Sequence, residues 1–382
     1  MTGGGSGGHI TPILAVAAEL KRLQPDVTIV YIGQTGDALA DIPASDPNID
    51  ASYSVRAGKF RRYHGETWRL FFDLPTMFLN VRDAFYTLIG IAQSYRLMRQ
   101  LKPVIIFTRG GFVSVPVAIG GRFNHVPYIT HDSDALPSLA NRLIAKHAVL
   151  HAVALPEDVY PYPRDKTITT GIPINTHNSL VTPAARVAFR QTIGLEQFSR
   201  VLLVTGGGNG AHALNQAVLL GVPAILSANP DCAIVHIAGR SLAEQLSQDY
   251  DALLSPADRT RVVVKDFVTD FYKYSGAADV IIARAGATNL AEFAVQAKAC
   301  IIIPPRQLIW AVKNSEALAE RGAVVALSDA QLAADREILP QTVNELLGDD
   351  IRRQALAEAL HGFARPDAAK RLAMVLLEQA KK

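Results

Sequence analysis

Cysteine is scarce in this sequence, and long apolar runs are absent from it. Cys232 and Cys300 are the two cysteines among 382 residues, and neither stands in a metal-ligand spacing. The sequence therefore excludes a disulfide framework, and isolated thiols are typical of a reducing compartment. No stretch reaches the ~18 uninterrupted apolar residues that indicate a membrane-spanning helix. The glycine-rich start lacks the basic and apolar character of a secretory signal, so we expect a cytoplasmic location.

Charge is also low and nearly balanced. Charged residues make up 19% of the sequence and the net charge is +3, a surplus too small to predict binding to nucleic acid. Apolar residues make up 49%, a proportion typical of globular and not of disordered chains. A length of 382 residues is enough for two domains, each with a core of its own.

Glycine gathers in two matching loops. Thr2-Gly-Gly-Gly-Ser-Gly-Gly-His9 recurs as Thr205-Gly-Gly-Gly-Asn-Gly-Ala-His212, with six of the eight positions identical. Such clusters suit backbone that turns with positive φ and approaches another group closely. Each copy precedes a helical pattern, and a helix N-terminus behind such a loop favours an anion. The alternative is that each loop is only a tight strand-to-helix turn.

Strand and helix patterns alternate in both halves, which predicts two similar α/β domains that face each other, each with a mostly parallel sheet. Apolar runs predict strands at 27–32, 51–55, 104–108, 127–130, 148–154 and 167–169 in the first half, and at 201–204, 233–238, 262–264, 280–283, 300–303 and 324–327 in the second. We expect a domain at 1–175 and another at 176–382, because proline and polar residues gather between Pro156 and Pro183. One or two helices within 350–381 follow, as candidates to pack back on the first domain.

The first glycine loop lacks a preceding strand. The second loop follows the buried strand Val201–Val204, whereas Met1 alone stands before Thr2. A parallel α/β domain normally begins with a strand near the middle of its sheet. We therefore expect a short strand-forming segment to precede Met1 in the native polypeptide.

The stretch from Arg56 to Arg99 mixes basic and aromatic residues. Arginine and lysine alternate with phenylalanine, tyrosine, tryptophan and methionine along it. This composition fits a surface on an anionic bilayer, where rings enter the interface and cations meet headgroups. The alternative is that the rings fill the core of the first domain, and we expect Phe71, Phe72, Leu79 and Phe85 to be at least partly buried.

His9 is the best candidate for a general base. In open parallel sheets, ligands bind beyond the carboxyl ends of the strands, and the glycine loops and the motifs described below all occupy such positions. Imidazole titrates near neutral pH, which suits it to accept a proton. The alternative is a histidine that only caps its own turn.

The run from Ala283 to Glu292 is the most informative part of the second half. Gly286 and Ala287 follow a strand as a close-approach turn, and Thr288 then supplies a donor at a helix start. Glu292 stands one turn further on, where a carboxylate can accept two hydrogen bonds from a ribose diol. The alternative is that Glu292 is a capping residue, although its spacing is not that of a capping box.

Five motifs in this order resemble the MurG family of UDP-N-acetylglucosamine transferases, which act on undecaprenyl-diphospho-muramoyl-pentapeptide. They are the first glycine loop with its histidine, Arg109-Gly-Gly-Phe-Val-Ser, Gly171-Ile-Pro173, the second glycine loop, and the Gly286–Glu292 run. The resemblance covers roughly residues 2–375. It implies the GT-B architecture, an inverting reaction and no metal in the chemical step.

The resemblance also implies residue roles. His9 is expected to act as the base, and the acceptor is expected to contact Gly5, Ser6, Gly7, Gly8, Arg109, His131 and Asp132. The donor is expected to contact Gly207, Gly208, Asn209, Gly210, Gly286, Ala287, Thr288, Glu292 and Asn314. The Asp132-Ser-Asp134 spacing is an alternative divalent-metal site, but its place after His131 favours acceptor contact or helix capping.

The sequence departs from the family pattern at several positions. The family's His-Glu-Gln-Asn stands here as His131-Asp-Ser-Asp134, and its Gly-Asn-Pro-Val-Arg as Gly171-Ile-Pro-Ile-Asn175. A glutamine pair falls at Trp310-Ala311, and Gly208 replaces a serine of the second glycine loop. These departures leave the exact donor sugar open.

The predicted activity is therefore transfer of N-acetylglucosamine from UDP-N-acetylglucosamine to the lipid-linked acceptor, converting lipid I to lipid II in peptidoglycan and cell wall synthesis. The expected partners are this donor, the undecaprenyl-linked acceptor and the inner-leaflet membrane surface, with no nucleic acid and no cofactor. Two alternatives stay open: a UDP-sugar epimerase of the same fold, and a catalytically inactive nucleotide-sugar-binding protein at the membrane.

Overall fold

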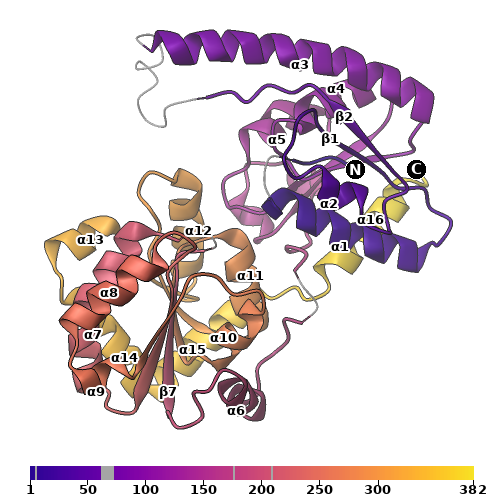
Figure 1. Cartoon of the computed structure of the whole chain (residues 1–382). Coiled ribbons are helices and arrows are strands. Elements are labelled where there is room, and N and C mark those ends of the chain that lie inside the picture. The colour runs from indigo at the N-terminus through magenta and orange to yellow at the C-terminus, as the bar shows by residue number, and fades with distance from the viewer. Residues whose placement is uncertain (5–6, 62–72, 175–176, 208–209) are drawn as a thin grey trace. The chain divides into compact units, whose positions relative to one another are not determined.

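The computed structural model describes residues 1–4, 7–61, 73–174, 177–207 and 210–382. The chain forms two compact units, which are shown in Figure 1. The first unit comprises Met1–Asn175 and Arg365–Lys382, and the second comprises Thr176–Ala364. Each unit holds a parallel sheet of its own, so the predicted α/β class with two parallel sheets is confirmed.

The sheet of the first unit is parallel throughout. Its first two strands, β1 (Val30–Gln34) and β2 (Ala51–Val55), pair with each other. The other four pair in chain order and are β3 (Ile106–Thr108), β4 (Tyr128–Asp132), β5 (Leu150–Val153) and β6 (Thr167–Thr169). Consecutive parallel strands bring all their carboxyl ends to one edge, where ligands of such sheets bind.

The N-terminal residues join these two sets of strands. Thr2 forms parallel bridges with both Ile32 and Thr108, and the Met1 ammonium donates to the Val30 carbonyl at 2.6 Å. Met1 and Thr2 thus occupy a strand position between β1 and β3. Burial of the ammonium lowers its pKa from 8.0 to about 5, because the charged form loses its hydration there.

Helices cover the sheet of the first unit on both faces. α1 packs against α16 from the other end of the chain, which Figure 1 shows in yellow beside it, and Ile13, Val16 and Leu372 are buried between them. The helices of this unit are α1 (Gly7–Leu23), α2 (Asp41–Ala44), α3 (Leu74–Leu101), α4 (Ser114–Phe123), α5 (Leu139–Ile144) and α16 (Ala368–Gln379), with short 3-10 turns at Ala145–His147, Glu157–Val159 and Arg164–Lys166.

Several of the most exposed side chains of helix α3 are apolar, whereas several of its buried residues are small or polar. Its fully buried residues are Asp83, Gly90, Ser94 and Met98. A Cβ on Gly90 would meet the Arg56 carbonyl oxygen at 1.9 Å, and one on Gly120 of α4 would meet the Ser94 Cβ at 2.6 Å. Its exposed face carries an apolar stripe, namely Leu74, Phe78, Val81, Phe85 and Leu88, each more than 60% exposed. Leu79 is half-buried as expected, but the expectation that Phe85 is partly buried is wrong, because α3 packs on α4 through its opposite face. Phe71 and Phe72 lie outside the described residues.

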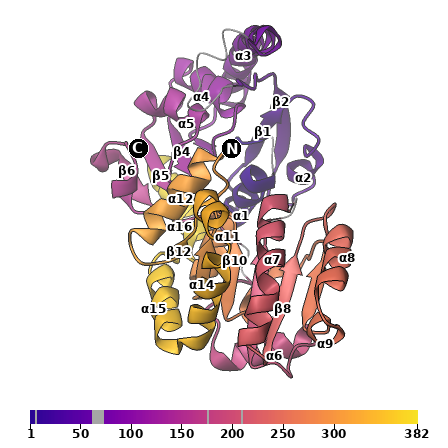
Figure 2. The same ribbon diagram turned by 90° about the vertical axis from the view of Figure 1, so that its left-hand side faces the viewer.

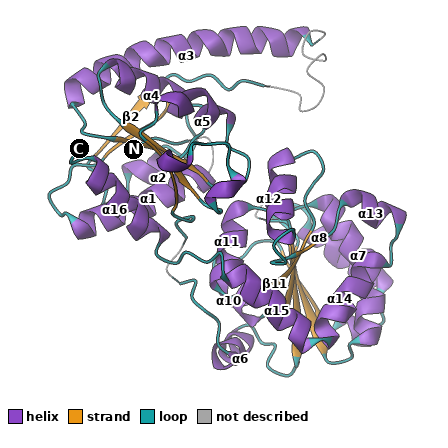
Figure 3. Cartoon of the chain, turned by 180° about the vertical axis from the view of Figure 1, so that it is seen from behind, coloured by secondary structure: helices purple, strands orange, loops and turns teal. Residues whose placement is uncertain are grey.

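The second unit is a six-stranded parallel sheet in the order β12-β11-β10-β7-β8-β9. Figure 2 shows α7 and α14 along this sheet, and Figure 3 shows helices on both of its faces. Its strands are β7 (Arg200–Thr205), β8 (Cys232–Ile237), β9 (Val262–Lys265), β10 (Val280–Ala283), β11 (Ala299–Ile302) and β12 (Val325–Ala326). The central strands are mostly apolar because helices cover both faces.

Ten helices of the second unit are described. They are α6 (Pro183–Thr192), α7 (His212–Ala228), α8 (Ala243–Leu253), α9 (Pro256–Arg259), α10 (Phe271–Ala277), α11 (Ala287–Val295), α12 (Ile309–Ala319), α13 (Asp329–Ala334), α14 (Ile338–Gly348) and α15 (Asp350–His361). Within the described part of the chain, no helix combines the length and apolar character that crossing a bilayer requires.

Candidate active site

The first unit holds its predicted residues at the carboxyl ends of β3 and β4. Arg109 directly follows β3, and His131 and Asp132 are the last two residues of β4. All three side chains are buried, with 4%, 1% and 4% exposure. The structure therefore brings these three predicted acceptor-side residues together, but as a buried group and not as an open surface.

The first glycine loop is held by residues of strand β1 and the turn after it. The Tyr31 hydroxyl donates a hydrogen bond to the Gly3 carbonyl, and a Cβ on Gly4 would lie 3.1 Å from an Asp37 carboxylate oxygen. Gly5 and Ser6 lie outside the described residues. Sequence reasoning missed Tyr31 and Asp37, because nothing in their local sequence distinguishes them from other strand and turn residues.

The helix behind this loop begins within the glycine motif itself. α1 starts at Gly7, so Gly7, Gly8 and His9 form its first turn. Their backbone is described but their side chains are not, so the orientation of the predicted base stays a prediction. The first-turn N–H groups of α1 have no partner within the helix and carry the positive end of its dipole.

Arg109 and His131 form a buried pair. An Arg109 Nη1 hydrogen points at His131 Nδ1, while His131 Nε2 lies 2.9 Å from the Gly171 carbonyl oxygen. Since a carbonyl only accepts, Nε2 is assigned as the N–H donor and Nδ1 as the acceptor. Burial and the Arg109 charge lower the pKa of His131 well below its usual 6.5, so this imidazole is neutral at physiological pH.

Asp132 is engaged inside the first unit through both carboxylate oxygens. Its Oδ1 accepts from the Ser138 backbone N–H at 3.1 Å, and its Oδ2 accepts from the Tyr162 hydroxyl at 2.7 Å. Burial raises its pKa. Asp132 therefore holds the chain that follows β4 in place. Its partners Tyr162 and Ser138 could not be identified from local sequence patterns.

Arg109 supplies the positive charge of this group. Burial lowers its pKa from 12.5 to about 10, against the opposing effect of Asp134 and Asp132. The guanidinium therefore stays charged at neutral pH. A fixed cation at the carboxyl edge of a sheet favours an anionic ligand nearby.

Replacing Arg109 with leucine is expected to lower the free energy of unfolding by about 3–5 kcal/mol at pH 8, because it leaves buried carboxylates without their cation. The loss should be smaller at pH 5 than at pH 8, because burial raises the pKa of Asp132 and a carboxyl closer to its neutral form depends less on the cation. Urea unfolding at both pH values measures this. The exposed Arg122→Leu change in α4 is the control, and equal losses at the two pH values would contradict the assignment.

The second glycine loop has the backbone that its glycines predict. Gly207 and Gly210 have φ values of +86° and +75°, and the Gly210 N–H donates to the Gly207 carbonyl at 2.9 Å. A Cβ on Gly210 would lie 2.1 Å from the Ala238 carbonyl oxygen, so the loop fits against β8 only with glycine there. Gly208 and Asn209 lie outside the described residues.

The Gly286 turn lies next to this loop. β10 pairs with β7, so the residues that follow the two strands leave the same edge of the sheet side by side. α7 begins at His212 and α11 begins at Ala287, which places two helix N-termini there. A Cβ on Gly286 would meet nothing within 4 Å, so the space over the start of α11 is open.

Asn314 anchors the turn at Gly286 through a hydrogen bond to its backbone. It is buried on α12, and its Nδ2 donates to the Ala285 carbonyl at 3.1 Å. The bond fixes the backbone just before Gly286, Ala287 and Thr288. Asn314 therefore shapes the predicted donor side through the turn that it anchors.

Glu292 is the titratable group of the second unit's site. It stands four residues after Thr288 on α11, and burial raises the pKa of its carboxyl from 4.5 to about 7. Asn178 opposes this shift by donating from Nδ2 to Glu292 Oε1 at 3.5 Å. Sequence reasoning missed Asn178, which lies 114 residues away along the chain.

Comparison with known protein families gives two matches that together span most of the chain. Residues 1–150 match the glycosyltransferase family 28 N-terminal domain, and residues 201–372 match the glycosyltransferase family 28 C-terminal domain. The first match lies within the first structural unit, and the second match lies in the second unit except for residues 365–372, which belong to the first.

Full-length relatives are similar as well. The chain is 30% identical to a UDP-N-acetylglucosamine–N-acetylmuramyl-(pentapeptide) pyrophosphoryl-undecaprenol N-acetylglucosamine transferase of Moorella thermoacetica, over 99% of this chain and 98% of the relative. It is 28% identical to the transferase of the same name from Geobacter sulfurreducens, over 100% of this chain and 98% of that one.

Solved structures show the same fold. The crystal structure of MurG from Acinetobacter baumannii superposes with a TM-score of 0.74 at 23% identity, covering 99% of this chain and 98% of that one. The UDP-GlcNAc 2-epimerase from Neisseria meningitidis, solved with UDP-GlcNAc bound, superposes with a TM-score of 0.66 at 14% identity, covering 99% of both chains.

Proposed function

Because the chain belongs to the MurG family of UDP-N-acetylglucosamine–N-acetylmuramyl-(pentapeptide) pyrophosphoryl-undecaprenol N-acetylglucosamine transferases, we propose that it transfers N-acetylglucosamine from UDP-N-acetylglucosamine to the lipid-linked muramoyl-pentapeptide. The product is lipid II, and the reaction serves peptidoglycan synthesis. The observation that carries the proposal is the 30% identity to the Moorella transferase over nearly the whole of both chains.

The second unit is proposed to bind the donor. The N-termini of α7 and α11 meet at one sheet edge behind the loops that follow β7 and β10, and they supply N–H groups and dipoles for the donor diphosphate. As the glycosidic bond breaks, the same groups stabilise the leaving UDP, with no metal in the chemical step. Glu292 is proposed to accept hydrogen bonds from the ribose diol.

The first unit is proposed to bind the acceptor. His9 removes the proton from the acceptor hydroxyl as that oxygen attacks the anomeric carbon from the face opposite UDP, so the anomeric configuration inverts. The charge of buried Arg109 favours the acceptor diphosphate at the carboxyl edge of the sheet. His131, which is neutral, and Asp132 have a positioning role. The ring nitrogens of His131 and the carboxylate oxygens of Asp132 bind groups within the first unit.

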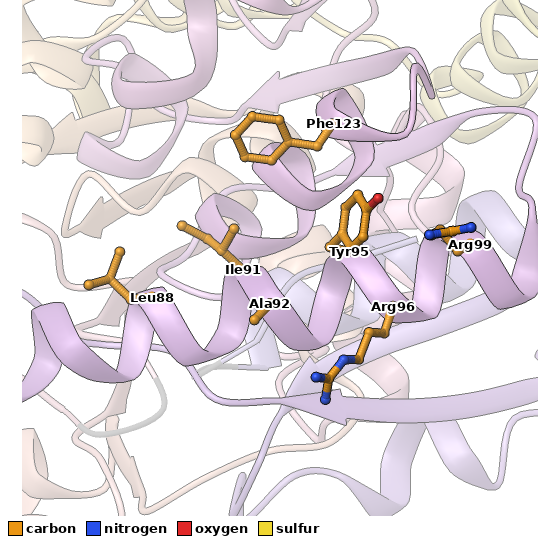
Figure 4. Close-up of a pocket in the computed structure, with 7 residues that line it drawn as sticks. All are labelled: Leu88, Ile91, Ala92, Tyr95, Arg96, Arg99 and Phe123. Carbon is orange, nitrogen blue, oxygen red and sulfur yellow. The ribbon is translucent and has the colours of Figure 1, made fainter.

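Helix α3 is proposed to lie on the cytoplasmic face of the cell membrane as a peripheral contact. Its exposed apolar stripe continues into a groove that Figure 4 shows, where Phe123 of α4 stands across from Ile91 and Tyr95. Arg96 and Arg99 line the same groove. Apolar side chains that enter the interface beside cations that meet anionic headgroups form a typical peripheral contact.

Replacing Phe85 and Leu88 together with glutamine is expected to weaken binding to anionic phospholipid vesicles at least about tenfold, since each buried apolar side chain contributes ~1.5–3 kcal/mol. Both side chains are more than 60% exposed, so the fold should not change. Vesicle co-sedimentation measures the effect. Leu220→Gln in the second unit, 57% exposed, is the control, and unchanged sedimentation of the double variant would contradict this contact.

The activity is tested by UDP release from UDP-N-acetylglucosamine with a short-prenyl-linked muramoyl-pentapeptide diphosphate, in the presence of EDTA. Release that requires the acceptor and ignores EDTA is the expected result. Conversion of UDP-N-acetylglucosamine without acceptor would instead indicate an epimerase. Tight UDP binding with neither reaction would indicate an inactive nucleotide-sugar-binding protein.

A further inference from the structure

A cavity of about 210 Å³ lies in the first unit and is used by no step proposed so far. Five separate parts of the chain form its walls: the segment after β2, helix α3, the loop after β3, the start of helix α4, and helix α5 with the residue before it. The residues from these parts that matter here are Lys59, Phe60, Thr87, Phe112, Leu139 and Leu143.

The lining is mainly apolar, with the hydroxyl side chains of Thr87 and Ser138 within it and one cation at its edge. Of the described residues that line the cavity, Lys59 alone is charged, and its side chain is exposed. Phe60 and Leu143 are 40% and 59% exposed, so the cavity has an apolar mouth. Such a combination favours an amphiphile with an apolar body and an anionic end.

The cavity shares the loop after β3 with the acceptor side of the first unit. Gly111 and Phe112 belong to its wall and directly follow the Arg109-Gly110 pair at the end of β3. Thr87 on α3 also belongs to the wall, next in sequence to Leu88 of the exposed apolar stripe. The cavity therefore has the buried cation Arg109 near one wall and the proposed membrane-facing helix as another.

Resting on the proposed function, we infer that this cavity binds the diphosphate-proximal part of the acceptor's polyprenyl chain, with Lys59 at the diphosphate. The muramoyl sugar and its peptide are polar and gain little from walls of phenylalanine and leucine. An aliphatic chain that carries a diphosphate matches both the apolar walls and the cation. The cavity would thus make the enzyme recognise the lipid as well as hold it near the bilayer.

The test uses soluble acceptors without vesicles, which removes the membrane contribution. Muramoyl-pentapeptide diphosphates that carry a ten-carbon prenyl group or a methyl group are compared by UDP release. The wild-type protein should show a KM about tenfold lower for the prenyl acceptor. Leu143→Gln should remove most of this difference, and Leu23→Gln at the end of α1, outside the cavity, should keep it.

Equal KM values for the two acceptors in the wild-type protein would overturn the inference, and so would a Leu143→Gln variant that keeps the full difference. Because these outcomes require turnover, calorimetry with geranyl diphosphate and inorganic pyrophosphate is the second measurement. Geranyl diphosphate should bind about tenfold tighter to the wild-type protein, and Leu143→Gln should lose this advantage.

The two measurements separate the inference from the proposed function. If no acceptor is turned over but geranyl diphosphate still binds tighter than pyrophosphate in a Leu143-dependent way, the proposed function fails and the cavity assignment stands. Lys59→Ala should weaken the binding of geranyl diphosphate and of pyrophosphate by the same factor, because the change removes the positive charge and leaves the apolar wall intact. Equal binding of both diphosphates to the wild-type protein would overturn the cavity assignment.

Discussion

Replacing His9 with alanine is expected to lower kcat about 10²- to 10⁴-fold, the usual contribution of a general base, and to leave the affinity for UDP unchanged. The acceptor hydroxyl is a weak nucleophile until its proton is removed, and His9 is the titratable residue that directly follows the first glycine loop. It belongs to the first unit, whereas the proposed nucleotide contacts all belong to the second. Turnover and nucleotide affinity should therefore separate.

UDP release under saturating donor and acceptor measures kcat, and calorimetry measures UDP affinity. His147→Ala is the matched control, because His147 is an exposed histidine of the same unit and should tolerate the change. An unaltered kcat in the His9 variant would remove the base assignment. A parallel loss of UDP affinity would instead indicate that the substitution disturbs the whole protein.

Sequence reasoning predicted the strands well because parallel strands covered on both faces are apolar throughout. β7, β8 and β10 of the second unit are buried along nearly their whole length, and each was expected within one residue of its observed bounds. β1 shows the limit of this reasoning. It begins at Val30 and not at Val27, because apolar residues that precede a strand extend the pattern without joining the ladder.

Helix α3 shows why the face of an element is harder to predict than its existence. An apolar stripe normally indicates the buried side of a helix, and here it lies on the exposed side. The informative signal was on the opposite face of the helix. There Gly90 lies against Arg56, and Ser94 lies against Gly120 of α4, at distances that only small residues allow. Small residues at helical spacing mark close helix packing, but they are also common in loops, so the sequence alone gave no reason to rank them above the aromatic residues.

The site follows the same division between local and long-range information. The glycine loops were predictable because positive φ at Gly207 and Gly210 is a local requirement. The partners of the functional side chains were not, since Tyr162 meets Asp132 and Asn178 meets Glu292 across 30 and 114 residues. Only the fold brings these pairs together. The burial of each side chain and its hydrogen-bond partners, which together set its charge, are therefore visible only in the structure.

Replacing Glu292 with glutamine is expected to weaken UDP binding about 100-fold or more, since two hydrogen bonds from a ribose diol to a carboxylate contribute ~1.5–3 kcal/mol each. The change should also remove a pH dependence. The carboxyl has a pKa of about 7, so it is mostly protonated at pH 6 and mostly ionised at pH 8. Affinity for the wild-type protein should therefore rise over this range. Uridine is the better probe for this part, because it has no phosphate that titrates.

Stability should move in the opposite direction. A carboxyl whose pKa is raised from 4.5 to about 7 by burial contributes full stability below pH 4.5 and loses it as pH rises through 7. Glu292→Gln should therefore increase the free energy of unfolding by about 1–3 kcal/mol at pH 8 and have little effect at pH 4.5. The exposed Glu196→Gln change in the same unit is the control.

A variant that loses uridine affinity without gaining stability at pH 8 would place Glu292 at the nucleotide but contradict its burial as the cause of the raised pKa. A variant that gains stability and keeps uridine affinity would mean that the carboxylate is merely buried. We expect the variant to lose uridine affinity and to gain stability. This combination is typical of a buried charged group that destabilises the fold but is needed to bind the ligand.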